Sequence, residues 1–320
     1  MRILLWHVHG SWTTAFVQGP HTYVVPVNSA RDGDGLGRAR TWDWPDSVVE
    51  RTPAQLRDEP IDLVIVQRPH ELQVVEEWTG RRPGAGLPAI YLEHNTPGGD
   101  VPFTRHPLAD QRDIPIVHVT HFNRLIWDTG TAHTHVIEHG IPDPGHQYVG
   151  DLPHLAVVMN DPGRRTRAVG ADLVPRLAAV APVDAFGMRV DVLSDPAAGV
   201  TTFEDLPQAQ LHAELARRRV YVHTARWTSL GLSLIEAMQL GMPVIALATT
   251  EAPSAVPAGT GVVSANIDEV VRAIRDFVHE PGMAQEIGER CRVHALERFG
   301  LERFLTDWDA VLADLAVART

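Results

Sequence analysis

Residues 226–246 read Arg-Trp-Thr-Ser-Leu-Gly-Leu-Ser-Leu-Ile-Glu-Ala-Met-Gln-Leu-Gly-Met-Pro-Val-Ile-Ala. The middle is an apolar run that carries one acid, Glu236, and it stops at Gly241, just before a proline and a β-branched run. Glycine is common just past the end of a helix, and proline does not continue one. The stretch therefore predicts a helix over 232–239 and a buried strand over 243–246.

The loop over 228–231 leads into the start of this predicted helix. Free N–H groups and the helix dipole favour a phosphate at such a position. Glu236 lies about one turn further on among apolar residues, so its carboxylate needs partners. The hydroxyls of a ribose would suit it, because a carboxylate accepts two strong hydrogen bonds. Pairing with a nearby arginine is the structural alternative.

Outside this stretch, short apolar runs alternate with amphipathic ones, which is typical of parallel sheets covered by helices. The predicted helices cover residues 70–78, 123–128, 170–180, 211–217, 232–239, 267–279 and 283–298. The predicted strands cover residues 2–8, 22–27, 61–67, 88–92, 116–120, 135–138, 155–160, 183–186, 190–193, 220–223, 243–246 and 261–263. The fold class is therefore α/β, with two tandem Rossmann-like, doubly wound parallel-sheet domains that face a cleft.

The chain has 320 residues, which suits two hydrophobic cores better than one. A Pro/Gly stretch over 141–145 is suited to a domain boundary. We expect one domain over 1–145, a second over 146–300, and a C-terminal helix over 301–320 that packs back on the first domain.

Composition excludes several classes of function. The net charge of −12 disfavours nucleic-acid binding. All 28 cationic residues are arginine, which rules out a lysine Schiff base or a Walker lysine. One cysteine leaves no disulfide or multi-cysteine metal site. With no apolar run long enough to span a bilayer, a cytoplasmic protein with at most peripheral membrane contact is expected.

Two further groups of residues are candidates for a site. The segment 160–170 follows a predicted strand and holds three arginines in what we expect to be a Pro/Gly loop before a helix. A guanidinium group can donate two parallel hydrogen bonds to phosphate oxygens, so these arginines could bind a diphosphate. Such a basic stretch is also compatible with a solvated surface. In the first domain, Gly10 and Ser11 follow the first strand, and His94 ends a later one. A glycine there permits close approach of a ligand, whereas His94 could equally be a core histidine.

The second half resembles the retaining nucleotide-sugar glycosyltransferases of the two-Rossmann (GT-B) fold, specifically family 4. The resemblance covers roughly residues 150–300 with specific motifs, and the first half only loosely. Its matching residues are Gly231-Leu232, Glu236-Ala237-Met238, Gly241 and Pro243-Val244-Ile245.

The resemblance implies transfer of a sugar from a nucleoside diphosphate sugar to an unidentified hydroxyl acceptor, with the anomeric configuration retained and with no metal or other cofactor. It makes Glu236 the ribose carboxylate and places Thr228 where the family has a first glutamate. It gives His94 a position that faces the donor sugar. The implied catalytic residues are therefore His94, Thr228 and Glu236, and the donor-binding residues are Gly10, Ser11, Arg164, Arg167, Ser229, Leu230, Gly231 and Leu232.

Two alternatives remain open. Because Thr228 cannot supply a charge, the chain could be a non-catalytic sugar-nucleotide binder or a partner subunit. Alternatively, His7 and His9 at the end of the first strand could bind a metal, as in amidohydrolases built on a TIM barrel.

Overall fold

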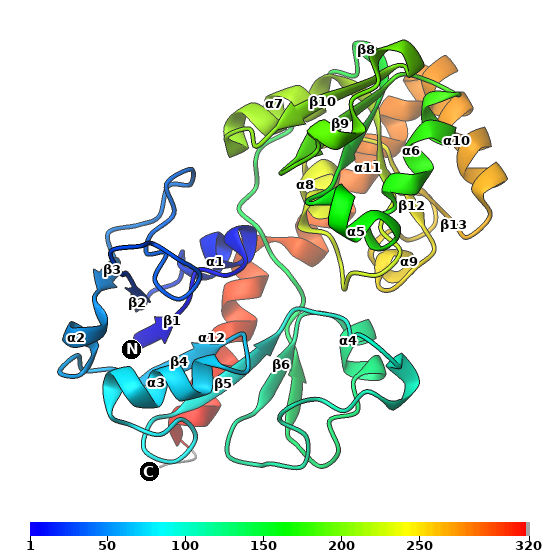
Figure 1. The fold of residues 1–320 in the computed structure, drawn as a ribbon. Coiled ribbons are helices and arrows are strands. Elements are labelled where there is room, and N and C mark those ends of the chain that lie inside the picture. Colours follow the sequence, from blue (N-terminus) through cyan, green and yellow to red (C-terminus); the bar gives the residue numbers. More distant parts are fainter. Residues whose placement is uncertain (318–320) are drawn as a thin grey trace. The chain divides into compact units, whose positions relative to one another are not determined.

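The computed structural model describes residues 1–317. Contacts between residues divide the chain into two compact units (Figure 1). The first unit contains Met1–Ile141 together with the C-terminal segment from Leu301, and the second unit contains Pro142–Gly300. Each unit is built around its own parallel sheet.

The sheet of the first unit has seven strands in the order β3-β2-β1-β4-β5-β6-β7, and every neighbouring pair is parallel. The strand order reverses between β1 and β4, which is the topological switch point of a doubly wound sheet. The strands are β1 (Arg2–Leu5), β2 (Thr22–Pro26), β3 (Val48–Arg51), β4 (Leu63–Val66), β5 (Ala89–Glu93), β6 (Ile116–His118) and β7 (Thr134–Val136).

Helices cover both faces of this sheet. One face packs its apolar side chains against residues of α2 and α3, including Leu56 and Val75. On α1, Trp12 and Phe16 pack against Trp308 of α12, with ring centroids 5.6 and 5.0 Å apart. The helices are α1 (Gly10–Phe16), α2 (Pro53–Leu56), α3 (Glu71–Thr79), α4 (His121–Ile126) and α12 (Leu301–Val317).

The sheet of the second unit has six strands in the order β10-β9-β8-β11-β12-β13, again parallel throughout. Its switch point lies between β8 and β11. The strands are β8 (Leu152–Val158), β9 (Val183–Gly187), β10 (Val200–Glu204), β11 (Arg218–His223), β12 (Val244–Leu247) and β13 (Val262–Ser264).

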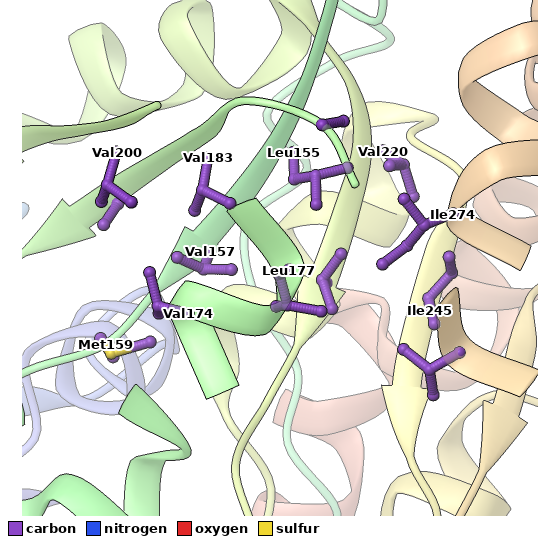
Figure 2. Close-up of a cluster of buried hydrophobic side chains, with 14 of the residues drawn as sticks. Leu155, Val157, Met159, Val174, Leu177, Val183, Val200, Val220, Ile245 and Ile274 are labelled. Atoms are coloured by element: carbon purple, nitrogen blue, oxygen red, sulfur yellow. The ribbon is translucent and has the colours of Figure 1, made fainter. Parts of the chain in front are cut away.

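Alternation along β11 shows how the second sheet is covered. Val220 and Val222 belong to a core formed with Leu177 and Ile274 of the covering helices. Figure 2 shows Val220, Leu177 and Ile274 in this core. Tyr221 points to the other face, where its hydroxyl meets Ser233 of α8. The helices of this unit are α5 (Pro162–Val169), α6 (Val174–Ala178), α7 (Gln208–Arg217), α8 (Leu232–Leu240), α9 (Ala252–Ala255), α10 (Ile267–His279) and α11 (Pro281–Phe299).

The predicted fold class, two Rossmann-like parallel-sheet domains, is confirmed, while three local predictions need correction. The strand predicted over 190–193 is wrong, because Asp191–Leu193 is a single 3-10 turn in which Leu193 N–H donates to the carbonyl of Val190. The edge strands β3 and β10 were missed because they carry polar residues, as exposed edges usually do. The arginine-rich segment contains a helix, α5, that begins at Pro162.

Two open sheets also overturn the TIM-barrel alternative, since neither sheet closes on itself. Within residues 1–317, no helix is both long and apolar enough to cross a membrane.

Candidate functional site

The second sheet brings two of the segments singled out in the sequence to its switch point. Residues 160–170 follow β8 and residues 224–231 follow β11, and these two strands are neighbours in the sheet. Parallel sheets of this kind bind ligands outside the carboxyl ends of their strands, at the switch point. Strand order therefore places the arginine-rich segment and the Thr228 loop at the expected position of a ligand.

Backbone strain is concentrated along the same edge. Six non-glycine residues in the described chain have a positive φ. Four of them follow the carboxyl ends of β8, β9, β10 and β12, and these are Asp161, Arg189, Asp205 and Thr250, with φ between 43° and 58°. Strained backbone of this kind often accompanies a binding or catalytic site.

Hydrogen bonds join the segment that follows β11 to the end of α5. The hydroxyl of Thr224 donates to the last carbonyl of α5 at 2.7 Å. The backbone N–H groups of Arg226 and Trp227 both donate to the carbonyl of Ala168, at 2.8 and 3.1 Å. The two segments at the switch point therefore form one hydrogen-bonded unit.

Arg164 is one of the two arginines expected to bind phosphate. It lies in α5, and its Nε donates to the carboxylate of Asp161 at 2.6 Å. Arg189, from the segment after β9, approaches the same carboxylate at 3.4 Å. The pKa of Asp161 lies below its usual value, mainly because Arg164 donates a hydrogen bond to its carboxylate.

Arg167, the other expected arginine, is part of a similar group. Its Nη1 lies 2.8 Å from the carboxylate of Asp172. Arg226, from the segment after β11, donates to both oxygens of Asp172, at 2.6 and 3.0 Å. This bond to Arg226 is the main cause of a lowered pKa at Asp172.

The side chains of Arg164 and Arg167 are 75% and 77% exposed. Surface ion pairs of this kind contribute only about 0–1 kcal/mol, so a phosphate can compete with the aspartates for these guanidinium groups. Each of the two aspartates is paired with two arginines, so each set keeps one positive charge that its aspartate does not neutralise.

The loop before α8 has the geometry expected for an anion-binding helix start. Gly231 is the N-cap of α8 in an extended conformation, with no side-chain cap and no acidic residue in the first turn. Ser229 and Leu230 before it are buried, and Leu232 after it begins the helix. The N–H groups that precede Leu234 at the start of α8 therefore have no intrahelical acceptor, whereas that of Leu234 donates to the carbonyl of Gly231 at 3.0 Å.

Gly231 lies close to the side chain that ends β11, so a larger residue here would have to displace that side chain. A Cβ at this position would lie 2.6 Å from the Cε1 atom of His223, the buried residue that ends β11. Burial lowers the pKa of His223 to about 4, so its ring is neutral near pH 7. Thr228 lies in the same loop and is half-buried.

Glu236 is almost completely buried in α8, as the apolar run around it predicts. Its Oε2 lies 3.6 Å from Nε2 of His212 on the neighbouring helix α7. One turn before Glu236 in α8, Ser233 is hydrogen-bonded to the hydroxyl of Tyr221 at 2.9 Å. A buried carboxylate with a polar partner fits either a structural role or a binding role.

His94 lies in a cluster of imidazole rings at the carboxyl edge of the first sheet. Its ring centroid is 3.9 Å from that of His9 and 6.0 Å from that of His139, and Trp12 lies 5.4 Å away. Burial lowers the pKa of His94 well below 6.5 and lowers those of His9 and His139 to about 4 and about 3. Nε2 of His94 is shielded from solvent and has no hydrogen-bond partner among the described residues.

Gly10 begins the short helix α1, and Ser11 follows it, half-buried. A Cβ at Gly10 would make only ordinary contacts, 3.6 Å to Trp42 and 3.7 Å to His7. The residues around Gly10 therefore leave room for the methyl group of an alanine, whereas the residues around Gly231 do not.

The structure does not support a metal site at His7 and His9. Strand β1 ends before both residues, His7 packs against Trp44 with centroids 4.8 Å apart, and His9 packs against His94. No group of three or more histidine, cysteine or acidic residues in the described part of the chain is arranged to hold a metal ion.

Several neighbours of the expected residues were not predicted from the sequence. Arg189, Arg226 and His212 come from segments that only the strand order and helix packing bring to Asp161, Asp172 and Glu236. The one available signal was that Arg226 belongs to the same stretch as Glu236.

Comparisons with known proteins agree with this geometry. Residues 196–294 match the family model described as glycosyl transferases group 1. No curated protein matches the sequence significantly.

Among solved structures, the sucrose-phosphate synthase (tll1590) of Thermosynechococcus elongatus matches with a TM-score of 0.71 at 14% identity, covering 99% of this chain and 100% of that one. Anabaena Alr3699/HepE, in complex with UDP-glucose, matches with a TM-score of 0.69 at 13% identity, over 98% and 100% of the two chains. WaaG, described as a glycosyltransferase involved in lipopolysaccharide biosynthesis, matches with a TM-score of 0.64 at 13% identity, over 92% and 95%.

The class that fold and site define is therefore a protein with the GT-B fold. Within it, the second unit carries the segment that matches group 1 glycosyl transferases. Together, the segment and the fold support glycosyl transfer as the class of activity.

Proposed function

We propose that the protein transfers a glycosyl group from a nucleoside diphosphate sugar to a hydroxyl acceptor, with retention of the anomeric configuration. The observation that carries the proposal is the switch point of the second sheet, where an excess of arginine adjoins the start of a helix that holds a buried carboxylate. The UDP-glucose complex of the similar Anabaena protein supports a nucleotide sugar as donor.

In this proposal the diphosphate is held by Arg164, Arg167 and the N–H groups of residues 229–231. Negative charge grows on the diphosphate as its bond to the sugar breaks, and donors already in place stabilise that charge. Gly231 and Leu232 set the direction of the first N–H groups of α8.

The other residues bind the sugar nucleotide. Glu236 accepts hydrogen bonds from the ribose hydroxyls, and Thr228 can exchange one hydrogen bond with a sugar hydroxyl. From the first unit we assign His94 to the sugar and Gly10 and Ser11 to donor contacts. His94 would act as a neutral imidazole, because burial lowers its pKa well below 6.5.

Retention without a protein nucleophile requires attack on the same face from which the diphosphate leaves. The acceptor hydroxyl forms the new bond to the anomeric carbon, the bond to the diphosphate oxygen breaks, and that oxygen takes the acceptor's proton. Proton NMR of the product tests this step, since an inverted anomeric linkage would overturn it.

Glu236→Gln is the central test of the donor site. The substitution keeps the shape of the side chain and removes its charge, so the bonds from the ribose lose their charge assistance. We expect a loss of about 100-fold in the affinity for the donor nucleotide, or about 2.7 kcal/mol. Calorimetry with UDP and with GDP measures it, and the exposed Glu286→Gln on α11 is the matched control. Unchanged affinity in Glu236→Gln would contradict the role of Glu236.

Arg167→Ala tests the diphosphate contact. Loss of one charge-assisted contact predicts about tenfold weaker binding of UDP or GDP, while Asp172 keeps its bonds to Arg226. Arg176→Ala is the control, since Arg176 is also exposed and paired with an aspartate, Asp268, on α10. If Arg167→Ala and Arg176→Ala bind both nucleotides equally well, Arg167 does not contact the diphosphate.

A non-catalytic binder is the second candidate, and the observation that favours it is Thr228 at the position of a family glutamate. Such a protein would bind a donor and turn over none across a broad panel of acceptors. Glycosyl transfer to any acceptor in the panel would eliminate this candidate.

A further inference from the structure

We propose that His212 is a positioning residue that fixes the Glu236 carboxylate, and that Gln208 in turn fixes His212. This inference rests on the proposed function, in which Glu236 binds the ribose of the donor. It adds a helix, α7, that none of the expected site residues belongs to.

The three side chains form a continuous line across two helices. Gln208 and His212 lie one turn apart on α7, and the Gln208 amide nitrogen is 2.7 Å from Nε2 of His212. The same Nε2 is 3.6 Å from Oε2 of Glu236 on α8. The side chains of His212 and Glu236 are only 11% and 6% exposed, so water screens their interaction little.

The carboxylate determines the tautomer of His212. A lone pair on Nε2 would point toward a negatively charged oxygen, which is repulsive, so the proton resides on Nε2. Because an amide nitrogen cannot accept a hydrogen bond, this tautomer requires the Gln208 amide to be flipped, so that its oxygen replaces the nitrogen beside Nε2 and accepts from the N–H group. The Nε2–H then donates to Gln208, and the Glu236 carboxylate, 3.6 Å away, is held by electrostatic attraction to the same N–H group rather than by a hydrogen bond.

This arrangement prepares Glu236 for a ligand. A glutamate side chain has three rotatable bonds, and fixing them before binding lowers the entropy lost when a ribose arrives. A residue that acts in this way changes the affinity for the ribose hydroxyls and not the chemical step. Its removal should therefore raise the donor KM and leave kcat nearly unchanged.

The experiment compares UDP with 2′,3′-dideoxy-UDP, which lacks both ribose hydroxyls. The ratio of the two affinities, measured by calorimetry, reports how strongly the protein holds those hydroxyls. In His212→Leu, which removes the N–H, we expect the ratio to fall about tenfold. In His212→Gln the new amide can again donate to the carboxylate, so we expect the ratio to be close to its wild-type value. If His212 had a merely structural role, His212→Leu would weaken the binding of both nucleotides equally and leave the ratio unchanged.

Gln208→Leu should lower the same ratio about threefold, whereas Gln210→Leu, at an exposed position on the same helix, should not change it. A double-mutant cycle shows whether His212 acts through Glu236: adding His212→Leu to Glu236→Gln should have no further effect on the ratio.

The outcomes separate the two levels of the proposal. If Glu236→Gln leaves the ratio unchanged, Glu236 does not bind the ribose and the proposed donor site is wrong. If Glu236→Gln lowers the ratio and His212→Leu does not, the donor site stands and the role of His212 is overturned. An equal loss for both nucleotides in His212→Leu also overturns that role.

Discussion

The free energy of unfolding of the first unit is expected to fall by at least about 4 kcal/mol between pH 7 and pH 5, because that unit buries several imidazoles in neutral form. Burial lowers the pKa of His9 to about 4 and those of His118 and His139 to about 3. The pKa of His94 is lowered well below 6.5 by the same cause.

The sign follows from proton binding. In the unfolded chain these histidines take up protons as the pH falls below about 6.5. In the folded chain they remain neutral until about pH 4. The unfolded state therefore binds more protons between pH 4 and 6.5, and acid stabilises it over that window. The contribution is complete above pH 7 and is lost as the pH falls.

Each strongly shifted imidazole loses roughly 2 kcal/mol of its contribution to stability between pH 7 and pH 5, from 1.36 kcal/mol per pKa unit. Repulsion among His9, His94 and His139 acts only when the folded unit takes up protons, below about pH 4, so it does not reduce this loss. His118 and a single ring of the cluster together already account for about 4 kcal/mol, which is therefore the least that we expect.

Tryptophan fluorescence during urea unfolding measures this effect, since Trp227 is the only one of the eight tryptophans outside the first unit. In His118→Leu the dependence between pH 7 and pH 5 should be smaller by about 2 kcal/mol. His118 is a suitable site, because it is fully buried and neither of its ring nitrogens has a partner in the described chain. The exposed His133→Leu is the control. An identical urea midpoint at pH 7 and pH 5 would refute the prediction.

The second large effect is expected for Gly170→Ala, which should destabilise the second unit by about 3 kcal/mol. Gly170 ends α5 with φ of 78°, a conformation unfavourable for alanine. A Cβ there would also lie 2.0 Å from the carbonyl oxygen of Thr224. Because that atom is backbone, the clash can be relieved only if the segment after β11 moves.

Calorimetry should show the melting temperature of the second unit lowered by about 6–12 °C in Gly170→Ala. Gly163→Ala in the same helix is the matched control, since its Cβ would meet only Val192, at 3.9 Å. We expect that control to melt within about 2 °C of the wild type. If Gly170→Ala also melts within about 2 °C of the wild type, the close approach of Gly170 to Thr224 does not contribute to the stability of the second unit.

Gly170→Ala should also weaken nucleotide binding, because the displaced segment leads into the loop before α8. Stability and binding are coupled here through the hydrogen bonds from Arg226 and Trp227 to Ala168. A glycine that only ends a helix would affect stability alone, whereas we expect Gly170→Ala to lower both stability and nucleotide affinity.

Most of the fold could be predicted from local pattern. The helix over 267–279 was predicted with the bounds that α10 has, and the central strands were placed within a few residues. These elements have strong apolar periodicity and clear endings. The edge strand β10 and the helix α5 could not be predicted in the same way, because their residues are mostly polar and their structure depends on neighbours.

By itself the sequence determined the two-sheet architecture and the helix that holds Glu236, since apolar periodicity and the positions of glycine and proline act over a few residues. Only the tertiary structure decided the partners: His212 beside Glu236, Arg226 beside Asp172, and His9 and His139 beside His94. The physical reason is that strand order and helix packing bring together residues far apart in the chain, and no local spacing encodes which of them meet.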